Sequence, residues 1–207
     1  MAYSSELDSY FLTLFDRYFT NVVVSGKQID LDFNFDELLR WLLKMGYNMG
    51  RARQWDGIQH LAACKDYIRL GEPRPDSISV LLQATPPGLI PGPKPTQLPP
   101  DMFAVNAMRV PPIVEKFAFA LHVGVHCYQF YVLFHLPEIK GSERDRRVKA
   151  FQRIFRGAHE ISPGKPVMKI YPSSITLWML LHGPLWNAGF AQNLMHHLKQ
   201  ARAKRQR

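Results

Sequence analysis

Residues 35–53, FDELLRWLLKMGYNMGRAR, decide the fold that we predict for this chain. Apolar side chains recur there every three or four residues, as they do in a helix that buries one stripe. The stripe consists of Leu38, Leu42, Met45 and Met49. We therefore predict one long helix in the core, around which the rest of the chain is organised.

The two ends of this predicted helix carry opposite charges. Asp36 is the expected N-cap, because its carboxylate can accept hydrogen bonds from the free amides of the first turn. Arg51 and Arg53 lie at the C-terminal end, where the helix dipole favours cations. Gly46 and Gly50 each cost roughly 1 kcal/mol relative to alanine inside a helix, so we expect another element to pack closely against them.

The composition is that of a globular protein with an aromatic-rich core. Of the 207 residues, 46% are hydrophobic and 12% are aromatic. No apolar run approaches the roughly 20 residues that span a bilayer, and the first residues lack the features of a signal peptide. Cys64 and Cys127 fit a reducing compartment as small buried side chains. We therefore expect a cytoplasmic protein that does not cross a membrane.

The remaining patterns predict an α+β fold over a single domain, 1–207. We expect a mainly antiparallel sheet of about five to seven strands with helices packed on it. Helical periodicity covers residues 7–19, 55–70 and 141–156, and two more helices are expected after residue 173. Strand patterns cover residues 22–24, 29–33, 77–85, 103–110, 113–121, 126–136 and 167–171. Residues 22–24 and 29–33 are expected to form a hairpin. The strands 113–121 and 126–136, separated by a turn at Gly124, are expected at the centre of the sheet.

Residues 86–100 form a proline-rich loop with seven prolines in fifteen positions. Proline removes a backbone donor and fixes φ, which excludes a helix or a central strand here. Two interpretations stay open. The segment is either a surface connection between strands or a ligand for an aromatic groove on a partner protein.

A net charge of +9 and a pI near 9.7 indicate a polyanionic partner. The positive charge gathers at residues 51–53, at 144–156 and in a basic tail, 199–207. The predicted helix 141–156 pairs an apolar stripe with a cationic outer face, which is suited to sequence-independent phosphate contacts. The expected nucleic-acid contacts are Arg144, Arg146, Arg147, Lys149, Arg153, Arg156, Arg51, Arg53, Lys204 and Arg205.

No catalytic site, cofactor or resident metal follows from the residue patterns. The eight histidines contain no set spaced like zinc ligands, and no phosphate-binding loop or nucleophile motif is present. His126 and Cys127 are neighbours on a predicted strand, where their side chains would face opposite sides. Asp30 and Asp32 alternate along another strand, so both carboxylates face one side, where they keep the strand solvated or hold Mg²⁺.

One region resembles a known family. Residues 39–52, LRWLLKMGYNMGRA, followed by residues 67–71, YIRLG, resemble the region that follows the nuclease motif in bacterial HNH-endonuclease proteins. The resemblance covers roughly residues 10–85. The HNH motif itself has no counterpart in this chain, so no catalytic residue is carried over. The resemblance implies an accessory domain that accompanies a nuclease in a phage-defence or mobile-element system.

Three functions remain open at this point. We favour a non-catalytic, basic accessory module that is associated with DNA or RNA. The alternative is a protein–protein interaction subunit, whose basic face meets an acidic partner and whose loop 86–100 docks. The second alternative is a metal-dependent nuclease that uses Asp30 and Asp32.

Overall fold

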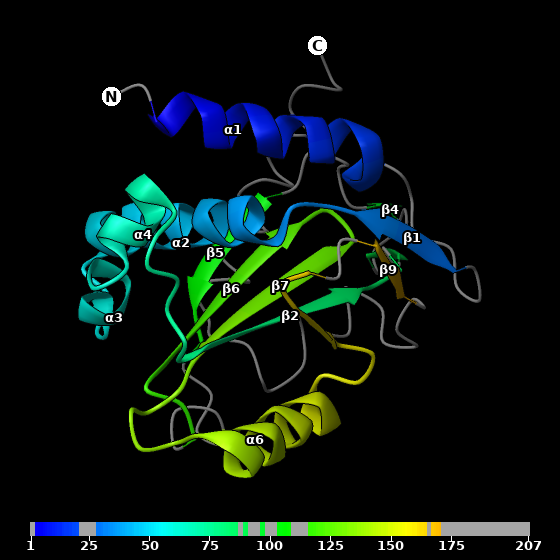
Figure 1. Cartoon of the computed structure of the whole chain (residues 1–207). Coiled ribbons are helices and arrows are strands. Elements are labelled where there is room, and N and C mark those ends of the chain that lie inside the picture. Colours follow the sequence, from blue (N-terminus) through cyan, green and yellow to red (C-terminus); the bar gives the residue numbers. More distant parts are fainter. Residues whose placement is uncertain are drawn as a thin grey trace.

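The computed structural model describes residues 3–20, 28–86, 89–90, 96–97, 103–108, 116–164 and 167–170. These residues form the predicted α+β fold, in which helices cover both faces of an antiparallel five-stranded sheet (Figure 1). In spatial order the sheet contains β5 (Phe103–Ala107), β6 (Phe119–Val125), β7 (Tyr128–Phe134), β2 (Ile78–Ala84) and β8 (His159–Ile161). No helix in the described ranges is long and apolar enough to cross a bilayer.

The hairpin of β6 and β7 lies inside the sheet, as predicted, and every residue of both strands is buried. Its turn was predicted at the wrong place. Val125 pairs with Tyr128, so the two-residue turn is His126–Cys127, with His126 in the left-handed region at φ 49°. Gly124 lies within β6, and this strand begins at Phe119 rather than at residue 113. Side-chain alternation could not fix this register, because both faces of the strands are buried.

The long helix α2 (Phe35–Arg53) occupies the predicted range, but its N-cap is Asn34 instead of Asp36. The Asn34 side-chain oxygen accepts hydrogen bonds from the amides of Asp36 at 3.0 Å and Glu37 at 3.3 Å. The Asp36 carboxylate instead accepts a 2.6 Å hydrogen bond from the hydroxyl of Tyr67. Both residues are good caps in isolation, and a tertiary contact assigns Asp36 a different role.

The two glycines of α2 allow the close packing that the sequence predicts. A Cβ atom on Gly46 would lie 2.5 Å from Leu121 of β6, and one on Gly50 would lie 2.5 Å from Ile58. The helix α1 (Tyr3–Leu14) and a π-helical turn (Phe15–Phe19) form a second layer over α2. The rings of Phe11 and Trp41 stack there with centroids 3.4 Å apart.

One other prediction needs correction. The expected helix 55–70 is two short helices, α3 (Ile58–Ala62) and α4 (Lys65–Leu70), because the chain turns at Ala63 and Cys64. The strand β1 (Ile29–Asp32) pairs with β9 (Val167–Ile170). Its expected hairpin partner, residues 22–24, lies outside the described residues. In the proline-rich loop, β3 (Leu89–Ile90) pairs with β4 (Thr96–Gln97).

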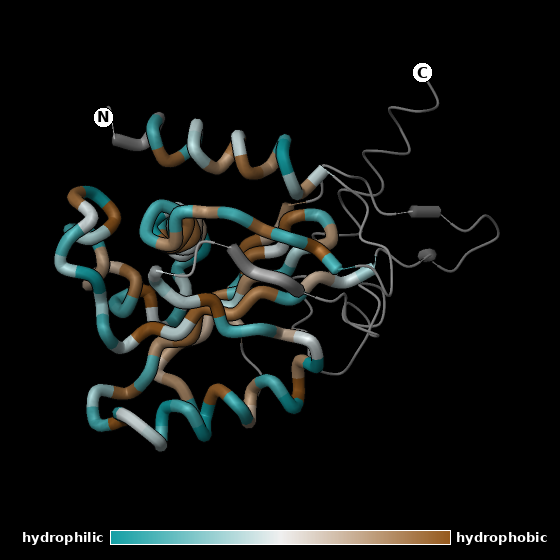
Figure 2. The backbone as a smooth tube through the Cα atoms, turned by 45° about the vertical axis from the view of Figure 1, so that its right-hand side comes forward, coloured by the Kyte–Doolittle hydropathy of each residue, from teal (hydrophilic) through white to brown (hydrophobic). Residues whose placement is uncertain are grey.

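The opposite face of the sheet is covered by α6 (Gly141–Ile154), close to the predicted range. The Tyr131 ring of β7 packs against Phe151 and Phe155, with centroids 5.2 and 4.8 Å away. Figure 2 shows hydrophobic strands at the centre, and α6 with alternating hydrophilic and hydrophobic residues. The amphipathic pattern therefore turns the apolar stripe of α6 toward the sheet and leaves its charged residues outside.

Candidate nucleic-acid interface

The outer face of α6 carries the exposed cations that the sequence predicts. Val148, Phe151 and Phe155 are buried against the sheet at spacings of three and four. Arg146, Lys149 and Arg153 repeat at the same spacing on the other side and are exposed. Because residues three and four apart share one face of a helix, these three cations form a continuous row, which we call the α6 row.

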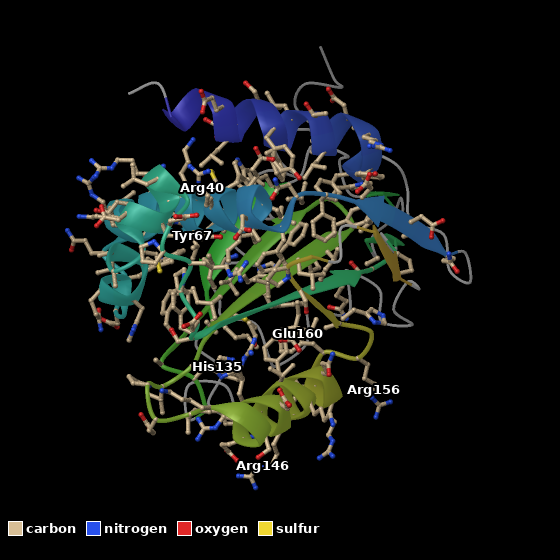
Figure 3. The ribbon with its side chains drawn as sticks, in the orientation of Figure 1. Arg40, Tyr67, His135, Arg146, Arg156 and Glu160 are labelled. Carbon is tan, nitrogen blue, oxygen red and sulfur yellow. The ribbon has the colours of Figure 1, made fainter. Side chains whose placement is uncertain are left out.

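Arg156 follows the end of α6 and adds an exposed side chain beyond the α6 row. Its backbone carbonyl accepts a 2.8 Å hydrogen bond from Nε2 of Gln83 in β2, which fixes this end of the helix to the sheet. Figure 3 shows Arg146 and Arg156 extending away from the sheet at the two ends of α6. The cationic surface therefore spans the length of the helix.

Arg144 has a different position from the other predicted contacts. Its guanidinium donates hydrogen bonds to the buried hydroxyl of Ser79 at 3.0 and 3.1 Å and forms an ion pair with Glu160 at 3.3 Å. Ser79 also lies 3.0 Å from Nε2 of His135. Arg144 thus ties α6 to β2 and β8, and its charge is largely compensated within the protein.

Arg147 is also partly withdrawn, since only 18% of its side chain is exposed. Its guanidinium donates to Glu143 at 2.9 Å and to the backbone carbonyl of Lys116. The hydrogen bond from Arg147 holds the pKa of Glu143 below its ordinary value, with a further contribution from Arg146. Glu143 therefore stays ionised and orients both arginines.

A cleft of about 380 Å³ lies beside the first half of α6, and we call it the basic cleft. It is lined by Lys116, Glu143, Arg146, Arg147 and Ala150. Three cations surround one carboxylate, so the cleft keeps an excess of positive charge. Lys116 was not predicted as a contact, because an isolated lysine between strands has no periodic signal that would place it beside a helix.

Arg51 and Arg53 lie on a separate basic surface. Both are exposed at the end of α2, which packs on the sheet face opposite to α6 (Figure 1). The ring of Tyr47 lies between two cations there, with the Arg51 guanidinium carbon 5.7 Å and Lys65 Nζ 5.2 Å from its centroid. A hydrogen bond with Lys65 lowers the pKa of the Tyr47 phenol. These arginines therefore do not extend the α6 row.

Two buried histidines occupy the sheet face beneath α6. His122 Nε2 lies 2.8 Å from Oε1 of Gln129, and burial lowers the pKa of His122 to about 4. Burial, with the nearby charges of Arg144 and Arg147, lowers the pKa of His135 to about 4 as well. Both side chains are therefore neutral near pH 7, so neither adds positive charge to the interface.

The structure also places the residues considered for catalysis. Asp30 and Asp32 are exposed on one face of β1, as predicted, and Asp30 accepts a 2.6 Å hydrogen bond from Gln28. Among the described residues, no three His, Cys, Asp or Glu side chains gather closely enough to hold a metal ion. Cys127 Sγ lies 3.6 Å from Nε2 of His126, which contradicts the expected separation, because the pair sits in a turn instead of a strand.

Several predicted contacts lie outside the described residues. These are Lys204 and Arg205 of the basic tail and most of the loop Pro86–Pro100. No protein-family model matches the chain, and no curated protein or solved structure shows significant similarity to it. The resemblance to HNH-endonuclease proteins therefore remains a prediction from the sequence.

Proposed function

We propose that this protein is a non-catalytic nucleic-acid-binding module, and that the outer face of α6 contacts the phosphate backbone of DNA or RNA. The observation that carries the proposal is the α6 row, in which Arg146, Lys149 and Arg153 are exposed on one face of a helix that is firmly packed on the other. Arg156 and Lys116 extend the row at its two ends. Such a row follows a phosphate chain without reading its sequence.

The remaining parts of the proposal rest on the sequence. The resemblance of residues 39–52 and 67–71 to an accessory region suggests that the module accompanies a nuclease in a defence or mobile-element system. A cytoplasmic location is proposed because Cys64 and Cys127 are buried and form no disulfide, as in proteins of a reducing compartment. Neither part is needed for the α6 row to bind phosphate.

The proposal is tested by the binding of a fluorescent duplex and a fluorescent single strand at low and moderate salt, with Mg²⁺ present. We expect binding that weakens steeply with salt and leaves both probes at full length. The triple variant Arg146→Ala/Lys149→Ala/Arg153→Ala should weaken it most. A matched variant of the opposite surface, Arg51→Ala/Arg53→Ala, should have a smaller effect.

The other outcomes separate the alternatives. If neither probe binds at low salt, the proposal is wrong and an interaction subunit becomes the better explanation. A shortened probe would reveal a nuclease, and Asp30→Ala would show whether the β1 carboxylates are responsible. If Arg51→Ala/Arg53→Ala has the larger effect, the interface lies on the α2 surface.

A further inference from the structure

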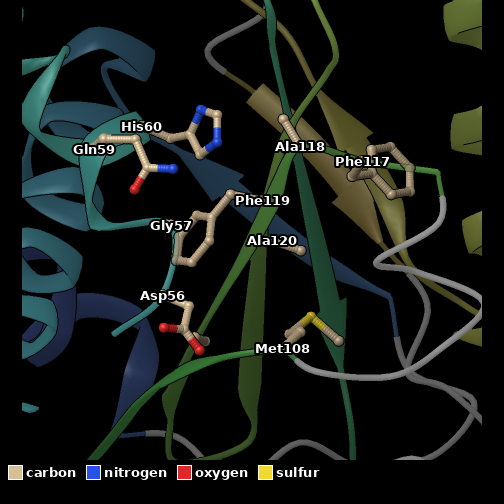
Figure 4. Close-up of a pocket in the computed structure, with 10 residues that line it drawn as sticks. Asp56, Gly57, Gln59, His60, Met108, Phe117, Ala118, Phe119 and Ala120 are labelled. Atoms are coloured by element: carbon tan, nitrogen blue, oxygen red, sulfur yellow. The ribbon is translucent and has the colours of Figure 1, made fainter. Parts of the chain in front are cut away.

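A second cavity lies between the start of α3 and the end of the sheet (Figure 4). Its volume is about 440 Å³, within the range of about 300–1,000 Å³ that is usual for small-molecule sites. One wall comes from the start of α3 and the other from the end of β5 and the start of β6. We call it the α3 cavity.

The walls of the α3 cavity combine polar and aromatic groups. Asp56, Gln59 and His60 line the side of α3, while Met108 and Phe119 line the side of the sheet. The His60 ring lies nearly parallel to the Phe119 ring, with an interplanar angle of 19° and centroids 6.3 Å apart. Figure 4 shows the Phe119 ring beside Gly57.

This chemistry suits a nucleobase better than a phosphate. No lysine or arginine is among the described residues that line the α3 cavity, and Asp56 would repel an anion. A carboxylate accepts hydrogen bonds from exocyclic amino groups of bases, and a glutamine amide both donates and accepts. Aromatic rings and a methionine provide the apolar contact that a flat heterocycle needs.

The two sites adjoin through consecutive residues. Lys116 lines the basic cleft, while Phe117 and Ala118, the next two residues, line the α3 cavity. Adjacent Cα atoms are about 3.8 Å apart, so the walls of the two sites meet at residues 116 and 117. Arg147 donates a hydrogen bond to the backbone carbonyl of Lys116, and Arg146 lines the same cleft. A phosphate and a neighbouring base could therefore be held at the same time.

We propose that the α3 cavity binds one unstacked base of a single-stranded nucleic acid, whose adjacent phosphate lies in the basic cleft. This inference rests on the proposed function and adds contacts to a base when the bound nucleic acid is single-stranded. Bases inside a duplex are stacked and paired, so they cannot enter a side cavity without being extruded. Base-dependent affinity is thus expected for single strands and not for duplexes.

The test compares a fluorescent single strand with an abasic strand of equal length and charge. We expect the base-containing strand to bind the wild-type protein at least about fivefold more tightly, because the base adds its contacts with the α3 cavity to those of the phosphate. The variant Asp56→Asn/Gln59→Ala should bring the two strands within about twofold of each other and leave abasic binding unchanged. Both residues are exposed, so the variant should fold.

Two control variants and the abasic strand distinguish a failure of the α3 cavity proposal from a failure of the proposed function. Asp66→Asn, an exposed carboxylate on α4 outside the α3 cavity, should behave like the wild type. The variant Arg146→Ala should weaken both strands by a similar factor. The α3 cavity proposal alone is overturned if the wild type binds the two strands equally. It is also overturned if Asp56→Asn/Gln59→Ala still binds the base-containing strand more tightly than the abasic strand. If the abasic strand also fails to bind at low salt, the proposed function fails instead.

Discussion

Replacement of the buried His122 by glutamine should remove part of the acid sensitivity of the fold. Burial lowers the pKa of His122 from 6.5 to about 4, so between these pH values the unfolded chain binds a proton that the folded chain does not. The neutral His122 therefore costs the fold no stability above about pH 6.5, and the free energy of unfolding falls as the pH decreases toward 4. The loss proceeds at up to about 1.4 kcal/mol per pH unit and totals roughly 3 kcal/mol.

The measurement is the free energy of unfolding in urea, at several pH values between about 4 and 7.5. The wild-type curve should fall with acid through both His122 and His135, whose pKa is also lowered to about 4 by burial. Between pH 6.5 and 4 the curve of His122→Gln should fall less steeply, because unfolding of this variant takes up about one proton fewer. Parallel curves for the two proteins would refute the assignment of a neutral, proton-excluding His122.

Three further predictions concern stability. Gly46→Leu should destabilise the fold by about 2 kcal/mol in urea unfolding, because even a Cβ atom added at this position would lie only 2.5 Å from the buried Leu121. Arg144→Ala should cost about 2 kcal/mol in the same measurement, because the buried hydroxyl of Ser79 loses its guanidinium donors. Asn34→Ala should cost about 1 kcal/mol, since the first turn of α2 loses its cap.

Neighbouring positions provide the controls for these variants. Asn48→Leu places the same side chain on the exposed side of α2, and Arg146→Ala removes an arginine that is 79% exposed. Both should change stability by no more than about 0.5 kcal/mol. If Asn48→Leu matches Gly46→Leu, close packing is not the reason for the glycine. If Asn34→Ala leaves the free energy of unfolding unchanged, the Asn34 side chain does not stabilise the first turn of α2.

Features that depend on local sequence could be predicted from this chain. The bounds of α2 follow from a regular apolar stripe between charged ends, and α6 follows from the same kind of pattern. Helical spacing also places Arg144 four, seven and eleven residues before Val148, Phe151 and Phe155. It therefore belongs to the buried stripe, and its role as an anchor could have been predicted.

Features that depend on distant contacts could not be predicted. The strand β1 pairs with β9, more than a hundred residues later, and no local signal identifies that partner. The strand β8 has only three residues, too few for an alternating pattern to stand out. The basic cleft and the α3 cavity each combine residues from separate elements, so they exist only once the chain has folded.

Phosphate binding by the α6 row is tested by the salt dependence of duplex binding, measured for the wild type and for Arg146→Ala/Lys149→Ala/Arg153→Ala. Each phosphate contact contributes about 0.9 to the slope of log K against log salt concentration. If the α6 row contacts phosphate with all three side chains, the line for the variant should be less steep, with a slope smaller in magnitude by about 2.7. Equal slopes for the two proteins would contradict a phosphate-binding role for α6.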